Sequence, residues 1–95
     1  MIYKLTFLES SKKEWGKLPD SIKKILKLKL IERLENPIHQ KDRLHGLPDC
    51  YKIKLKSSGY RLVYKVFSDK IVVQVIAVGK RDKLFVYKKA KSRLD

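Results

Sequence analysis

Hydrophobic and polar positions follow two different periods along the chain, helical in the first half and strand-like in the second. Before the helical part, residues 2–8 are rich in apolar and aromatic side chains, which predicts a first strand. Ser11 and Glu14 have the spacing of a capping box, which predicts the start of a short helix. Trp15 and Leu18 would form the apolar side of that helix.

A second helix is predicted from Pro19, because the missing N–H of proline costs nothing in a first turn. Its apolar residues recur at helical spacing and are Ile22, Ile25, Leu26, Leu30 and Leu34. Asn36-Pro37 is expected to end this helix. Residues 38–49 show no period and contain Gly46 and Pro48, which predicts a loop.

The second half of the chain predicts three strands and a last helix. In residues 51–56 apolar side chains alternate with lysines, which is typical of a strand with one apolar and one basic face. Residues 60–66 form the next predicted strand. Residues 71–78 are nearly all apolar, as expected of a central strand that is covered on both faces. Residues 84–94 are basic and weakly helical.

This order of elements predicts an α+β fold, built on a small antiparallel-rich four-stranded sheet. Two N-terminal helices would pack on one face, and a short C-terminal helix would follow the sheet. With 95 residues, the chain is expected to form a single domain over residues 1–95. The one cysteine, Cys50, excludes an intrachain disulfide, and no run approaches the roughly 18 apolar residues of a membrane span. A cytoplasmic location is therefore predicted, with no membrane partner.

Charge narrows the class of partner. Lys and Arg number 24 against 10 Asp and Glu, for a net charge of +14. Such an excess repels itself in a compact state, so a polyanion or an acidic protein is expected to neutralise it. Nucleic acid is the commonest such partner, since its phosphates would supply most of the affinity.

The position of this charge depends on the pairing of the strands. If Ser58-Gly59 is a two-residue hairpin loop, Ser57 pairs with Tyr60 and the apolar positions of both strands match. A slip of one residue would turn the lysines into the core. In this register Lys56 is opposite Arg61, Lys54 opposite Val63, and Lys52 opposite Lys65, with Gln74 and Ile76 beside Val63 and Arg61.

One face of the predicted sheet therefore collects cations, with no acidic residue between Asp49 and Asp69. Like charges opposite one another destabilise a sheet, which favours an anion site over an ordinary solvated surface. Gly79 would let the chain bend so that Arg81 reaches back over this face. Tyr87 could pack on the sheet or stack on an RNA base, and its spacing leaves both open.

The sequence does not indicate nucleotide binding, metal binding or histidine-based catalysis. The chain has no glycine-rich phosphate loop, and Cys50, His39 and His45 fit no zinc spacing, so neither a metal nor a cofactor is predicted. His45 is more simply an exposed loop histidine than a general base. RNA cleavage would then use the 2′-hydroxyl as nucleophile, with a lysine as base and an arginine stabilising the phosphate.

The stretch LPDCYKIKLKSSGYRLVY at residues 47–64 closely resembles the RelE toxins of type II toxin–antitoxin modules. The likeness continues at residues 78–81, at Tyr87 and at Glu14-Trp15, and it covers essentially the whole chain. It implies a microbial-ribonuclease-like α+β fold that lacks the usual His/Glu pair. It also implies a ribosome-dependent endoribonuclease that cuts mRNA in the ribosomal A site.

The resemblance further implies individual roles. Lys52 and Lys54 would be the basic pair, with one of them the general base, and the residues leave open which one. Arg61 would stabilise the transition state, Arg81 would assist the leaving group, and Tyr87 would stack on a base. The cations implied to hold RNA and the ribosome are Lys56, Lys65, Lys80, Lys83, Lys23 and Lys27. The implied partner is a RelB-like acidic antitoxin that wraps the toxin and displaces or blocks its C-terminal helix.

Two alternatives remain at this point. A ParE-like member of the same superfamily would keep the fold but poison DNA gyrase, and such proteins generally lack the lysine, arginine and tyrosine set. A non-catalytic basic module would bind RNA or the ribosome through charge alone.

Overall fold

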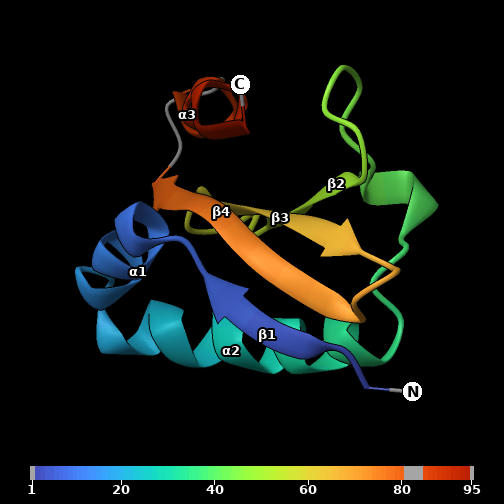
Figure 1. Ribbon diagram of the computed structural model, residues 1–95. Helices are drawn as coiled ribbons and strands as arrows, with labels where there is room; N and C mark the ends of the chain where they lie inside the picture. Colours follow the sequence, from blue (N-terminus) through green and yellow to red (C-terminus); the bar gives the residue numbers. More distant parts are fainter. Residues whose placement is uncertain (1, 81–84, 95) are drawn as a thin grey trace.

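Four strands form one mixed sheet in the order β1-β4-β3-β2 in the computed structural model, which describes residues 2–80 and 85–94 (Figure 1). The strands are β1 (Lys4–Phe7), β2 (Cys50–Lys54), β3 (Tyr60–Phe67) and β4 (Val72–Lys80). The helices are α1 (Glu9–Gly16), α2 (Asp20–Glu35) and α3 (Phe85–Leu94), with a 3-10 turn η1 at Gln40–Asp42. Each predicted strand and helix is present, so the α+β prediction is confirmed.

The sheet is antiparallel except at one edge. Strands β2, β3 and β4 form the predicted antiparallel meander, whereas β1 runs parallel to β4 with Lys4 paired to Val72. Helices α1 and α2 connect β1 to the meander, and α2 ends at Glu35, with Asn36 as its C-cap before Pro37, as predicted. In Figure 1, α2 lies below the sheet and α3 lies above it.

Strand β4 is buried on both faces, as its apolar sequence predicts. On the α2 side, Val73 and Val75 pack in one core with Leu26 and Leu30 of α2. On the α3 side, a second core holds Leu47, Cys50, Val63, Ile76, Ala77, Val86 and Ala90. The sheet therefore separates two cores, and α3 covers the smaller one.

A β-bulge changes the alternation along β4. Val63 pairs with Ala77 and Tyr64 pairs with Val75, so Ile76 is an extra residue without a partner on β3. Both Ile76 and Ala77 are fully buried in the core beneath α3. The predicted pairing of β3 with β4 is therefore wrong at this point. Gln74 lies opposite Lys65 and not beside Val63.

The hairpin register differs from the prediction by two residues. Lys54, not Lys56, is opposite Arg61, and Lys52 is opposite Val63. The loop spans four residues, because the Leu55 N–H donates to the Tyr60 carbonyl at 2.9 Å. A two-residue type I′ loop would need positive φ at two positions, whereas Gly59 alone in this loop has it, with φ 78°. An even shift preserves the faces, so Lys52, Lys54, Arg61 and Lys65 still share one side, whereas Lys56 lies in the loop and not in the sheet.

Ser11 and Glu14 do not form the predicted capping box. Helix α1 already begins at Glu9, and the buried Ser11 hydroxyl donates to the Val75 carbonyl at 2.6 Å. The Glu14 carboxylate instead accepts hydrogen bonds from β4 and α3. Both side chains serve tertiary contacts, which local spacing does not reveal.

Leu30 and Leu28 of α2 provide a matched test of the larger core. Leu30 is 1% exposed and Leu28 is 65% exposed. Leu30→Ala should lower the free energy of unfolding by about 2–5 kcal/mol, because it leaves a cavity between α2 and the sheet. Leu28→Ala should change it by less than about 0.5 kcal/mol. Urea unfolding followed by circular dichroism measures both, and equal losses would contradict this packing.

Cys50 reports on the core beneath α3. Burial raises the pKa of its thiol from 9.0 to about 11, opposed by the charge of Lys65 and aided by that of Asp49. At pH 8 the folded protein should therefore hold about a hundredfold less thiolate than an ordinary cysteine. A chromogenic disulfide reagent should react slowly with the native protein and fast in urea. Equal rates would show that Cys50 is accessible in the native protein.

The raised pKa of the Cys50 thiol also makes the stability of the fold depend on pH. Because the folded state favours the protonated thiol, this stabilisation is fully present below pH 9 and is lost as the pH rises through about 11.

Candidate active site

The candidate site lies on the face of the sheet that α3 partly covers. Lys54 of β2 is directly opposite Arg61 of β3, and Lys52 is the next residue of β2 on the same face. Lys54 is exposed, while Lys52 and Arg61 are half-buried. Strand alternation places these three side chains on the same side as Cys50 and Val63, away from α2.

Helix α3 places Tyr87 beside this group. Val86 and Ala90 bury one side of the helix against the sheet, and the adjacent Tyr87 is half-buried. Burial raises the pKa of the Tyr87 hydroxyl, while the charge of Arg61 and a hydrogen bond with it act in the opposite direction. The Tyr87 hydroxyl therefore lies next to the Arg61 guanidinium.

A groove separates α3 from the loop that precedes β2. It has a volume of about 200 Å³. Its lining residues are His45, Gly46, Leu47, Tyr87, Lys88 and Lys91. An aromatic wall with lysines around it is the combination that holds single-stranded RNA, since bases stack and phosphates pair with cations.

Arg33 of α2 holds the strand that carries Lys52. Its guanidinium donates to the Lys52 carbonyl at 3.2 Å, to the Tyr64 hydroxyl at 2.8 Å and to Asp42 at 2.7 Å. The Tyr64 hydroxyl in turn donates to the Pro37 carbonyl at 2.7 Å. This network joins α2, β2 and η1, so the backbone at Lys52 is fixed from the opposite side of the sheet.

The cations of the site are not neutralised by neighbouring acids. Within residues 2–80 and 85–94, side-chain ion pairs join Asp42 to Arg33 and Glu14 to Lys89 and Arg93, with His39 also near Asp42. No such pair in this part of the chain involves Lys52, Lys54 or Arg61. The face therefore presents uncompensated positive charge, as the sequence predicts.

The remaining predicted cations are dispersed. Lys56 is exposed in the loop between β2 and β3, and the Lys65 ammonium lies 5.1 Å from the centre of the Phe67 ring. The Lys80 ammonium lies 6.0 Å from the Tyr60 ring at the end of β4. Arg81 and Lys83 fall outside the described residues.

Lys23 and Lys27 lie on α2, the helix on the other face of the sheet from α3 (Figure 1). Ile25 and Lys29 of the same helix line one hollow with Lys54, so α2 reaches the edge of the candidate site.

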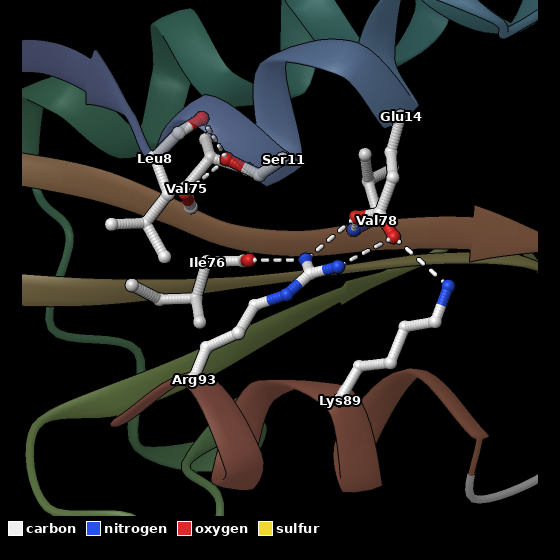
Figure 2. Close-up of polar contacts among 8 residues, drawn as sticks. All are labelled: Leu8, Ser11, Glu14, Val75, Ile76, Val78, Lys89 and Arg93. Carbon is white, nitrogen blue, oxygen red and sulfur yellow. Dashed lines mark hydrogen bonds and ion pairs between the residues drawn. The ribbon is translucent and has the colours of Figure 1, made fainter. Parts of the chain in front are cut away.

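One link in the site was not predicted. Glu14 of α1 pairs with Lys89 and Arg93 of α3 (Figure 2). These two C-terminal cations therefore contact a carboxylate of the protein itself. The only sign of this in the sequence is that Lys89 and Arg93 are four residues apart and so share one side of a helix.

In residues 2–80 and 85–94, no three His, Cys, Asp or Glu side chains are grouped so that they could hold a metal ion. No helix in this part of the chain is long and apolar enough to cross a membrane.

Comparison with known proteins identifies the family. Residues 5–85 match the family described as "ParE toxin of type II toxin-antitoxin system, parDE". The chain is 53% identical over 94 residues to the "mRNA interferase toxin RelE" of Escherichia coli (strain K12), covering 99% of each. It is 43% identical to a "Putative RelE-like toxin protein" of Escherichia coli, again over 99% of each.

Solved structures agree with this assignment. A free-state structure of a mutant E. coli RelE toxin matches with a TM-score of 0.91 and 52% identity over 100% of both chains. The toxin in the intact E. coli RelBE toxin–antitoxin complex matches with a TM-score of 0.82 and 54% identity, over 85% of this chain and 99% of that one. The chain therefore belongs to the RelE toxins, within the ParE toxin family of type II toxin–antitoxin systems.

Proposed function

We propose that this protein is an mRNA interferase that cleaves mRNA in the ribosomal A site and thereby inhibits translation. The observation that carries the proposal is the juxtaposition of Lys54 with Arg61, together with Lys52 on the same face and Tyr87 beside Arg61. The 53% identity to a relative named mRNA interferase toxin supports the same activity.

The proposed reaction begins with the 2′-hydroxyl of the RNA. Lys52 or Lys54 removes its proton, and the oxygen attacks the adjacent phosphorus. The bond from phosphorus to the 5′-oxygen breaks as this oxygen gains a proton, leaving a 2′,3′-cyclic phosphate and a 5′-hydroxyl. Arg61, which stays protonated, stabilises the charge that grows on the phosphate oxygens.

Arg81 is proposed to assist the leaving group. Strand β4 ends at Lys80, the residue before Arg81, and Gly79 of the same strand pairs with Arg61. Lys80, the residue before Arg81, is therefore close to the proposed phosphate position, which supports the role.

Tyr87 is proposed to orient the substrate by stacking on a base in the groove between α3 and residues 45–47. Its ring lines that groove together with Lys88 and Lys91. Stacking holds the nucleotide, and the cations hold its phosphates, so the reacting bond would lie over Lys52, Lys54 and Arg61.

Ribosome dependence is proposed from the distribution of the remaining charge. Lys23 and Lys27 lie on α2, Lys56 in the hairpin loop and Lys65 on β3, so these cations are spread over three parts of the fold. Charge distributed in this way suits the extended ribosomal RNA around the A site better than one mRNA strand. Because the cations of the site supply the charge stabilisation, we propose that the reaction needs no metal ion.

The proposed partner is a RelB-like acidic antitoxin. RelE structures similar to this chain have been solved with the antitoxin RelB and with a RelB peptide. An acidic segment would neutralise much of the +14 charge and block the basic face. We infer that toxin and antitoxin act in the cytoplasm, where translating ribosomes are found.

Arg61 provides the main test. Arg61→Ala should slow cleavage of ribosome-bound mRNA by about 10²–10³-fold in a translating extract, because the phosphate loses its stabilising charge. Lys70→Ala, in the exposed turn between β3 and β4, should leave the rate unchanged. Primer extension measures the cuts. Uncut mRNA on ribosomes with the unmodified protein, or equal effects of both substitutions, would contradict the proposal.

The 2′-hydroxyl provides a test of mechanism. An mRNA with one 2′-deoxynucleotide at a known cut site should resist cleavage there, while neighbouring sites are still cut. The products at unmodified sites should carry 2′,3′-cyclic phosphate ends, which mass spectrometry detects. Cutting at the deoxy position would show that a water molecule, and not the 2′-hydroxyl, is the nucleophile.

Gyrase poisoning is the second candidate function, because the matching family is described by its ParE toxins. A gyrase poison would have the same fold but would not need the cleavage chemistry of Lys54 and Arg61. A supercoiling assay separates the two: inhibition of DNA gyrase without any mRNA cleavage would favour the ParE-like function.

A further inference from the structure

One carboxylate joins three elements of the protein. The Glu14 side chain of α1 is 17% exposed, and both of its oxygens accept hydrogen bonds from the Arg93 guanidinium, at 2.8 and 2.9 Å (Figure 2). The Lys89 ammonium donates to the same carboxylate at 3.0 Å. Forked arginine–carboxylate pairs fix direction as well as distance, so this contact constrains how α3 lies relative to α1.

The same cluster is attached to β4. The Val78 N–H donates to Glu14 at 3.2 Å, and Arg93 donates to the Ile76 carbonyl at 2.8 Å. Ile76 is the extra residue of the β-bulge and has no partner on β3. The position of α3 is therefore tied to an irregularity of the strand itself.

The charge state of Glu14 suits this role. Burial raises the pKa of the carboxyl, but hydrogen bonds from Arg93, Lys89 and the Val78 backbone outweigh it and hold the pKa below its ordinary value of 4.5. Glu14 is therefore ionised at neutral pH. Removing one partner of such a half-buried pair leaves the other charge uncompensated, which favours movement of α3.

Helix geometry connects the cluster to the candidate active site. With 3.6 residues per turn, Val86 and Ala90 lie on the side of α3 that faces the sheet. Lys89 and Arg93 then lie on one flank of the helix, and Tyr87 lies on the opposite flank, about 80° from the buried side. The apolar contact fixes which side faces the sheet, and the forked pair with Glu14 on one flank restricts rotation about the helix axis further.

We propose that Glu14 is a positioning residue, which sets the rotation of α3 and thereby holds Tyr87 beside Arg61. The predicted consequence for cleavage rests on the proposed function, whereas the consequence for the position of Tyr87 does not. The competing role is a purely stabilising ion pair, which would affect unfolding without displacing Tyr87.

The first experiment measures the position of Tyr87 without any activity assay. In protein with ¹³C-labelled tyrosine rings, the Tyr87 signal is assigned by its loss in Tyr87→Phe and titrated with pH. In Glu14→Gln the chemical shift and the titration of Tyr87 should both change, because a displaced ring alters its burial and its contact with Arg61. Glu32→Gln, the same change at an exposed site on α2, should leave it unaltered. An unaltered Tyr87 signal in folded Glu14→Gln overturns the proposal.

The second experiment measures single-turnover cleavage of ribosome-bound mRNA at saturating toxin. Glu14→Gln should lower this rate roughly ten- to hundredfold, with an unchanged dissociation constant for the ribosome, because Tyr87 is proposed to orient the mRNA and not to contact the ribosome. Arg93→Gln should have the same effect. The double substitution should be no worse than either single one, because the two residues act as a unit.

The outcomes separate the two proposals. If the unmodified protein does not cut mRNA, the proposed function fails, and the tyrosine titration still decides the role of Glu14. If cleavage occurs and Glu14→Gln weakens ribosome binding but not the rate, Glu14 is not a positioning residue. If Glu14→Gln does not fold, Arg93→Lys replaces it, since it keeps the charge and loses the fork. A smaller displacement of Tyr87 in the same direction is then expected, and none at all overturns the proposal.

Discussion

The need to cover strand β4 on both faces organises the whole molecule. Val73 and Val75 face α2 while Ile76 and Ala77 face α3, and all four side chains are fully buried. One face is covered by α2, a helix of 16 residues, but the other depends on the ten residues of α3. Because α3 also carries Tyr87, the helix that completes the core is a wall of the candidate site.

The few acidic residues near the site form ion pairs that stabilise the fold. Asp42 pairs with Arg33 behind β2, and Glu14 pairs with Arg93 beneath α3. Their positions leave Lys52, Lys54 and Arg61 without counter-charges on the described part of the face. The repulsion between them is a cost to stability that a bound polyanion would relieve, so the same charges that oppose folding favour binding.

The periodicity of apolar residues was enough to predict the order of the elements and the face that carries the cations. The face assignment survived the error in register, because a shift of two residues returns every side chain to the same side. The register itself depended on whether Ser58 adopts positive φ, which its sequence does not reveal.

The long-range polar contacts could not be predicted. Ser11 contacts Val75, 64 residues away, and Glu14 contacts Arg93, 79 residues away. The spacing of Ser11 and Glu14 fits a capping box, but in the folded protein both side chains make tertiary contacts instead. The family resemblance, in contrast, was recognisable because residues 47–64 carry both the strand pattern and the site residues.

The place of β2 at the edge of the sheet has a further meaning. An edge strand presents unpaired backbone groups that can join a strand of another copy and start an aggregate. Here the bridge between Arg43 and Tyr51 covers part of that edge, and Lys52 and Lys54 place positive charge along the rest. Two copies approaching edge to edge would bring like charges together. The lysines therefore also protect a small protein from polymerising, which ties its colloidal stability to the residues proposed for its chemistry.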